Sequence, residues 1–281
     1  MSESDRPVVK VVRGKAVTEG AGVRLTRMFP NPQLDMLDPF LLLDEFKSDK
    51  SGDYIAGFPS HPHRGFETVT YMLAGAMRHE DHTGATGELL PGGAQWMTAG
   101  RGVIHSEMPL QRGGLLWGFQ LWVNLPAARK MDPPRYQDIA PERIPSVTLE
   151  GGAVARVIAG EAGGARGPVE GIVTDPLYLD VTLAEGTSFI QRIPAGHTAF
   201  ALVYEGAARF GATALARGEL AVFGPGDVVR GAAESGGGRL ILLAAAPLNE
   251  PVARYGPFVM NTVDEIEKAF DDYRAGRLDA A

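Results

Sequence analysis

Cysteine is absent from this sequence of 281 residues, and its absence excludes several kinds of site. Without thiols there is no disulfide framework, no cysteine nucleophile and no sulfur ligand, so any bound metal must be held by nitrogen and oxygen atoms. Clustered positive charge is also missing. The 27 basic side chains are outnumbered by 34 acidic ones, the net charge is −7, and no run of Lys and Arg forms the patch typical of nucleic-acid-binding proteins. We therefore expect no direct contact with nucleic acid.

Long apolar segments are the third feature that the sequence lacks. No run approaches the roughly 18 apolar residues of a membrane span. The opening residues, MSESDRPVVK, contain no apolar core of a secretion signal. We expect a cytoplasmic monomer with no membrane contact. The 36 Gly and 20 Pro residues favour short strands joined by tight turns over long helices.

The domain organisation follows from the length and from the spacing of strand signals. The chain is nearly twice the roughly 150 residues of a typical domain, and β-forming runs between turn signals recur along both halves. Residues 126–145 are rich in Pro and charge, so we place the linker there. We expect an all-β protein with one domain over residues 1–135 and another over residues 136–281.

The C-terminal tail is the clearest helix in the sequence. The segment TVDEIEKAFDDYRAGRL offers Thr262 as N-cap and places Asp264 and Glu265 in the first turn, where acidic groups stabilise the helix. Its apolar stripe must dock on the rest of the protein, and it consists of Ile266, Ala269, Phe270 and Tyr273.

Histidine is scarce, and five of the six histidines lie between residues 58 and 109. His61 and His63 are two residues apart, and so are His105 and Glu107. On an extended strand this spacing places both side chains of a pair on one face. If the two strands face each other, three imidazoles and one carboxylate come together, which suits a divalent transition metal.

The choice of carboxylate stays open on the residues alone. Glu67 has the same parity as His61 and His63, so it competes with Glu107 unless the bend that Gly65 permits breaks the count. Glu67 could bind the metal, hydrogen-bond a ligand imidazole or pair with a cation.

Two neighbouring segments complete this region. His79 and His82 lie near a hairpin tip with the sequence HTGATG, and we expect both to face solvent. The run LLWGFQLWVNL at residues 115–125 alternates between an apolar face and a mixed face, which suits a strand that lines a cavity. A strand that packs one sheet against another would show the same pattern. The mixed face consists of Leu116, Gln120, Trp122 and Asn124.

A weak internal repeat relates the two halves. TVTYMLAG at residues 68–75 matches AFALVYEG at residues 199–206. In this alignment Arg192 and Pro194 stand where the first histidine pair stands. The second domain should therefore keep the fold and lack the metal.

The motifs together resemble a known family. HxHxxxE, a PGG turn and a later His are similar to the two-part signature of the cupin superfamily. The longer strings FPSHPHRGFETVTYMLAG, LPGGAQWMTAGRGVIHSEMP and APLNEPVARYGPFVMNT resemble the pirin family across most of the chain.

This resemblance implies two cupin barrels facing each other, closed by the C-terminal helix. It implies an iron-type metal, most simply Fe²⁺, in the N-terminal barrel only, although sites with N and O ligands also accept Mn, Co, Ni, Cu or Zn. Carried onto this sequence, the ligands are His61, His63, His105 and Glu107. Glu67 then becomes a structural residue or a partner of a ligand.

The resemblance also implies a function, quercetin 2,3-dioxygenase activity, in which O₂ opens the ring of a flavonol with loss of carbon monoxide. The partners would be O₂ and a small aromatic substrate, a flavonol or a catechol-like molecule, and Glu107 would accept the 3-hydroxyl proton. A first alternative is a redox-sensitive co-regulator that binds a protein partner without turnover. A second is a cupin isomerase that uses the metal as a Lewis acid without O₂.

Overall fold

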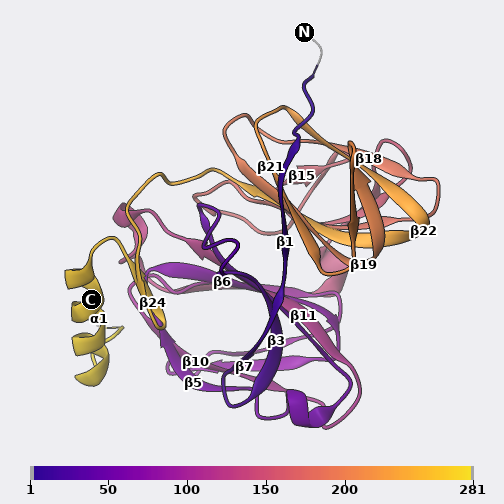
Figure 1. The fold of residues 1–281 in the computed structure, drawn as a ribbon. Helices are drawn as coiled ribbons and strands as arrows, with labels where there is room; N and C mark the ends of the chain where they lie inside the picture. Colours follow the sequence, from indigo (N-terminus) through magenta and orange to yellow (C-terminus); the bar gives the residue numbers. More distant parts are fainter. Residues whose placement is uncertain (1–2, 280–281) are drawn as a thin grey trace. The chain divides into compact units, whose positions relative to one another are not determined.

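The computed structural model describes residues 3–279, which divide into two compact units, each made of segments distant in sequence. The first unit comprises Lys15–Pro30, Asp38–Pro141 and residues 248–279, and the second comprises residues 3–14, Asn31–Leu37 and Glu142–Pro247. Regular structure is almost entirely strand, with the helix α1 near the C-terminus (Figure 1). The prediction of an all-β protein with a C-terminal helix is confirmed.

The strands of the first unit form a 7-stranded sheet, a 4-stranded sheet and a hairpin. The larger sheet has the order β12-β9-β6-β11-β4-β3-β2 and contains β2 (Lys15–Glu19), β3 (Val23–Phe29), β4 (Phe40–Ser48), β6 (Phe66–Ala74), β9 (Ala94–Thr98), β11 (Leu116–Asn124) and β12 (Arg135–Ile139). The smaller sheet has the order β5-β10-β7-β8 and contains β5 (Phe58–His63), β7 (Met77–Asp81), β8 (Thr86–Leu89) and β10 (Val103–Pro109). The remaining elements are β23 (Ala253–Tyr255), β24 (Phe258–Met260), α1 (Val263–Arg274) and the 3-10 turns η1 (Ser51–Asp53) and η2 (Ala127–Arg129).

The second unit is built around one 9-stranded sheet. It contains β1 (Val8–Arg13), β13 (Ser146–Thr148), β14 (Val154–Ala159), β17 (Leu177–Leu183), β18 (Ser188–Arg192), β19 (Thr198–Phe210), β20 (Thr213–Ala216), β21 (Glu219–Phe223) and β22 (Val228–Ala245). A small hairpin pairs β15 (Glu161–Ala162) with β16 (Ala165–Arg166), and the 3-10 turn η3 (Pro141–Arg143) lies where the chain enters this unit.

The two sheets of the first unit enclose an apolar core. Val23 and Phe46 of the larger sheet belong to the same buried cluster as Met77 and Leu89 of the smaller one. The strands alternate between buried and exposed positions: along β7, positions 77, 79 and 81 are buried while 78 and 80 are exposed. The cluster joins the two sheets into one body. β5 forms one edge of the smaller sheet, and β10 lies next to it.

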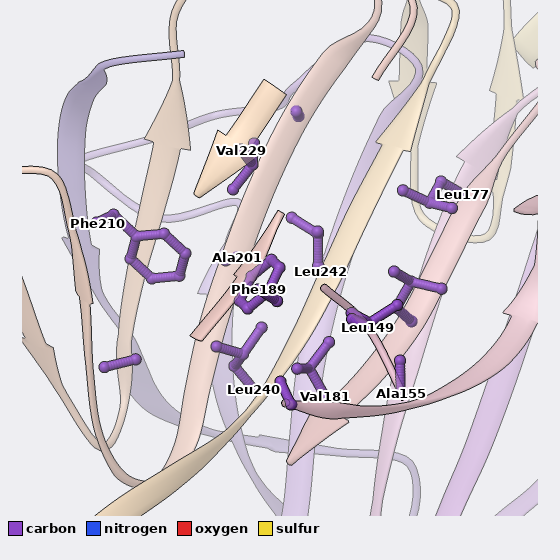
Figure 2. Packing of buried hydrophobic residues seen from close by; sticks show 14 of the residues in the cluster. Leu149, Ala155, Leu177, Val181, Phe189, Ala201, Phe210, Val229, Leu240 and Leu242 are labelled. Atoms are coloured by element: carbon purple, nitrogen blue, oxygen red, sulfur yellow. The ribbon is translucent and has the colours of Figure 1, made fainter. Parts of the chain in front are cut away.

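The interior of the second unit is filled by hydrophobic side chains. Figure 2 shows Phe189, Leu240 and Leu242 packed toward Val181 and Ala201, and all of these side chains are fully buried. Their strands are rich in Leu, Val and Ile, which favour the extended conformation and fill the space between layers. In the described part of the second unit, the interior is therefore occupied mainly by packed apolar side chains. The prediction that this half binds no metal stays a prediction.

A division of the chain at one point would place the N-terminus in the first unit and the C-terminus in the second. The structure shows the reverse. β1 pairs with β21, so the N-terminal strand belongs to the second unit. The segment from residue 248 onward, with α1, belongs to the first unit. β12 lies inside the predicted linker and pairs with β9, so the expected boundary between residues 135 and 136 falls within a strand. The physical reason is that backbone pairing satisfies the peptide groups of RYQDI despite its low content of β-formers.

The C-terminal helix has the predicted cap. The Thr262 hydroxyl accepts a hydrogen bond from the Glu265 backbone N–H, and the Glu265 carboxylate accepts one from the Thr262 backbone N–H, which completes a capping box. Ile266 and Ala269 are buried against Phe258 of β24. No helix described within residues 3–279 is long and apolar enough to cross a membrane.

Leu242→Ala tests the apolar core of the second unit. Leu242 is fully buried, so the cavity left by the truncation should lower the free energy of unfolding by about 2–5 kcal/mol. Val154→Ala in β14 is the matched control, because Val154 is 41% exposed and its truncation should cost about 0.5 kcal/mol or less. Urea denaturation followed by fluorescence measures both values, and equal losses would contradict the packing described here.

Candidate metal centre

The pairing of β5 with β10 creates the candidate site. The two strands are antiparallel, and their register places His105 opposite His61 and Val103 opposite His63. In an antiparallel pair, opposite residues point to the same face of the sheet. A bulge between His105 and Glu107 shifts the register by one residue, so Glu107 stands opposite Phe58. The predicted meeting of the two motif-bearing strands is confirmed.

Three imidazoles converge at this place. The ring centroids of His61 and His105 are 4.5 Å apart, those of His61 and His63 are 4.7 Å apart, and those of His63 and His105 are 5.1 Å apart. One ring nitrogen from each residue lies within 4.8 Å of the other two. Nitrogen atoms at these separations can enclose one metal ion, since each ligand would need only a short approach to reach about 2 Å from the ion.

The hydrogen bonding of the three rings fits a metal. His61 Nδ1 lies 2.8 Å from the Pro59 carbonyl oxygen, so this nitrogen is the donor and Nε2 keeps its lone pair for an ion. Both ring nitrogens of His105 and Nδ1 of His63 are buried and have no hydrogen-bond partner in the protein. Buried polar atoms without partners are rare in folded proteins, and a coordinated ion would satisfy one nitrogen of each ring.

The electrostatics favour the neutral form of His63 and His105, which is the form that binds metals. Burial, followed by the neighbouring His61 and His79 rings, lowers the pKa of His105 from 6.5 to about 3. Burial and then the rings of His105 and His61 hold the pKa of His63 well below 6.5. Interaction with the Pro257 backbone carbonyl raises the pKa of His63, but by less than these causes lower it. No proton has to leave these two rings at neutral pH before an ion enters.

Glu107 lies beside this cluster. Its carboxylate is 5% exposed and accepts a hydrogen bond of 3.1 Å from the Thr70 hydroxyl of β6. It lines the same cavity as His61 and His63. The tight group of nitrogen atoms described above consists of the three histidines, so the assignment of Glu107 as fourth ligand stays a prediction.

Glu67, the competing carboxylate, lies in a different setting. Its side chain accepts a hydrogen bond of 2.7 Å from Thr98 in β9, and burial raises its pKa to about 7. It is absent from the cavity lining. The parity argument does not carry over because β5 ends at His63 and β6 starts at Phe66, with Gly65 at φ +89° between them. Because of this break between β5 and β6, Glu67 does not share the face of His61 and His63, and Glu107 is the carboxylate beside the histidines.

A cavity of about 710 Å³ opens beside the histidines. This lies within the roughly 300–1,000 Å³ of small-molecule sites. Its walls are mainly apolar and aromatic, with an ion pair in which Arg27 donates to Asp44 at 2.7 and 2.9 Å. Gln120 and Trp122 line it, so the predicted cavity-facing side of β11 is confirmed at these two positions. The tip of the β23–β24 hairpin forms part of the wall.

His79 was expected to face solvent, and this expectation is wrong. It is 2% exposed, lies opposite Glu107 in the β7–β10 pair, and its Nε2 is 3.3 Å from Asp138 Oδ2. The ring of Tyr136 stacks on it at 5.3 Å. Gly87 makes room, since a Cβ there would lie 2.2 Å from His79 Nε2. The alternation of Met77, His79 and Asp81 in the sequence was the available signal for burial.

Comparison with known proteins places this site in a family. Residues 22–123 match the Pirin family, and residues 178–279 match the Pirin C-terminal cupin domain. A pirin-like protein from Caulobacter vibrioides is 49% identical over 97% of this chain and 99% of its own length. A Pseudomonas aeruginosa protein provisionally named quercetin 2,3-dioxygenase is also 49% identical, over 97% of this chain and 98% of that protein. The crystal structure of a quercetin 2,3-dioxygenase from Acinetobacter baumannii has a TM-score of 0.90 and 36% identity, with 98% of each chain covered.

The fold and the site together define a protein of two cupin domains that carries a three-histidine cluster able to bind a metal. The chain belongs to the pirin family.

The pKa of His105 predicts how the metal-free protein responds to acid. In the folded protein it is about 3, against 6.5 without burial, so below pH 6.5 the unfolded chain binds a proton that the folded chain does not. The contribution of His105 to the free energy of unfolding should therefore be fully present above about pH 6.5 and should fall as the pH drops toward 3. Denaturant titrations of metal-stripped protein at stepped pH should show a smaller fall in His105→Gln. An identical pH dependence in the variant would contradict this source of acid sensitivity.

Proposed function

We propose that this protein is a metal-dependent dioxygenase of quercetin-like flavonols. The observation that carries the proposal is the convergence of three imidazoles, two of which line a cavity with aromatic walls together with Glu107. Family membership and the names of the relatives support a cupin oxidoreductase. In the proposed reaction O₂ cleaves the two ring bonds of carbon 3, which leaves as carbon monoxide, and both oxygen atoms enter the ester product.

His61, His63 and His105 would hold the ion, with Glu107 as the fourth ligand. A divalent metal at this place, Fe²⁺ in our proposal, would supply positive charge for an ionised substrate oxygen and an electron route between substrate and O₂. Because imidazole binds metals as a neutral ligand and Glu107 would be the one carboxylate in the set, that charge would be only partly compensated.

Glu107 is the proposed base. Its carboxylate would accept the 3-hydroxyl proton as the flavonol enters and return it to the carboxyl group of the product. The Thr70 hydroxyl, which donates to Oε1 at 3.1 Å, would orient the carboxylate through that oxygen. The role of Thr70 is positioning, because it acts through Glu107.

The cavity walls suit a flat aromatic ligand. Trp122 and Phe58 offer ring faces or edges, and Leu25 and Leu42 add apolar surface that excludes water. Gln120 is the uncharged polar side chain on the β11 wall and could orient a hydroxyl group of the ligand.

The alternative function is a redox-sensitive co-regulator that binds a protein partner. The pirin-like name of a close relative and the net charge of −7 favour this alternative over direct nucleic-acid binding. Oxygen-electrode traces separate the two functions: steady O₂ consumption with flavonols supports the dioxygenase, and its absence in metal-loaded protein favours the co-regulator.

Glu107→Gln should lower kcat by about 100-fold or more, because it removes the base while retaining the shape of the side chain. Flavonol binding measured without O₂ should persist, since the other side chains that line the cavity are unchanged and glutamine has nearly the shape of glutamate. The measurement is aerobic turnover of quercetin together with anaerobic absorption titration.

Glu67→Gln is the matched control, because Glu67 lies outside the cavity lining. It should retain turnover within a few-fold of the wild type. Turnover at the wild-type rate in Glu107→Gln, or in His105→Ala, would refute the assignment. A loss confined to Glu67→Gln would transfer the role of base to that residue.

A further inference from the structure

Arg64 is a buried cation directly after the ligand residue His63. Its side chain is 2% exposed, and the guanidinium is always charged at ordinary pH. Nη1 donates to Asp272 Oδ2 at 2.8 Å and Nη2 donates to the Leu278 carbonyl at 2.6 Å, so two of its bonds reach the C-terminal segment. Nε donates to the Arg101 carbonyl.

The bond to Arg101 connects Arg64 with the second ligand strand. Arg101 lies in the turn that leads into β10, where His105 is located. The Gly65 N–H donates to the Gly100 carbonyl of the same turn at 2.8 Å. The Arg64–Gly65 bend therefore joins the end of β5, the start of β10 and the end of the C-terminal helix at one point. Two of these segments, β5 and β10, carry the three imidazoles.

A second buried cation, Lys130, is hydrogen-bonded to the same bend. Lys130 is 1% exposed, and its ammonium donates to the carbonyls of Gly65 at 2.7 Å and Val259 at 3.0 Å and to Asn124 Oδ1 at 2.7 Å. The Val259 N–H donates to the Arg64 carbonyl at 3.1 Å. A Cβ at position 65 would lie 1.9 Å from the Val259 carbonyl, so the β23–β24 hairpin packs directly on the bend.

The β23–β24 hairpin, which is held against the bend by these contacts, extends to the candidate metal centre. Its tip, Gly256 and Pro257, lines the cavity together with His61 and His63. Helix α1 supports the hairpin through Phe270, whose ring lies 4.8 Å from that of Phe258. The C-terminal segment is thus both a wall of the cavity and a neighbour of a ligand.

We propose that Arg64 is a positioning residue of the metal centre. By tying the C-terminal segment and the turn before β10 to the end of β5, it sets the spacing of the imidazoles, so that docking of α1 controls metal affinity. The inference rests on the three-histidine site and is independent of the flavonol chemistry proposed above. A purely stabilising role for Arg64 would lower the resistance to unfolding and leave the coordination of the ion unchanged.

The test uses Co²⁺ as probe in the full-length protein. Arg64→Met removes the charge and keeps most of the side-chain length. We expect Co²⁺ affinity, measured by competition with a chromophoric chelator, to fall about tenfold, the size of effect found when groups that orient metal ligands are removed. The visible absorption bands of the bound ion should shift. Arg64→Lys, which keeps the charge but cannot make all three bonds, should recover part of the affinity.

Asp272→Asn is the second variant and acts from the helix side. It weakens the ion pair at the far end of Arg64 without changing the bend, and it should shift affinity and spectrum in the same direction by a smaller factor. Lys268→Ala is the matched control. Lys268 also pairs with Asp272, at 3.1 Å, but its side chain is 68% exposed, so its removal should leave both readouts at wild-type values.

Wild-type Co²⁺ affinity and spectrum in Arg64→Met would overturn the proposal, even if the variant unfolds at a lower temperature. If Arg64→Met does not fold, Asp272→Asn decides: a wild-type spectrum and affinity in that variant would overturn the coupling to the helix. Because neither readout uses a flavonol, a failure of the dioxygenase proposal would leave this test unaffected.

Discussion

The antiparallel pairing of β5 with β10 is the constraint on which the site depends. It places His61 opposite His105, and side chains opposite each other in such a pair share one face of the sheet. A slip of β5 by one residue would turn His61 and His63 to the opposite face from His105. The register is supported from outside the pair, since β7 continues the sheet beyond β10 and the Gly65–Gly100 bond closes the end nearest His63.

Two buried cations, Arg64 and Lys130, stabilise the bend that follows β5, and each donates three hydrogen bonds. A buried charge is costly unless it is paired, and removing one partner of a buried pair typically costs about 3–5 kcal/mol. Arg64 and Lys130 offset this cost with Asp272, Asn124 and several backbone carbonyls. The C-terminal segment is therefore part of the first unit for electrostatic as well as for hydrophobic reasons.

The same strand rhythm serves different purposes in the two units. In the first unit the strands present histidines and a carboxylate to a cavity of about 710 Å³. In the second unit they present Leu, Val, Phe and Ala to a close-packed interior (Figure 2). In the first unit His105 keeps two buried ring nitrogens without a hydrogen-bond partner in the protein. The internal repeat in the sequence thus relates the architecture of the two units, while the three-histidine cluster lies in the first.

The sequence by itself determined the features that depend on local spacing: the paired motifs around His61 and His105, the all-β character, and the capping box of α1 at Thr262. These follow from residue periodicity and from hydrogen bonds between residues three or four positions apart. Only the tertiary structure decided the rest. It separated Glu107 from Glu67 by the bend at Gly65, because parity is lost where a strand breaks. It buried His79 and assigned β1 and α1 to their units, because long-range pairing and docking depend on partners that lie far away in the chain.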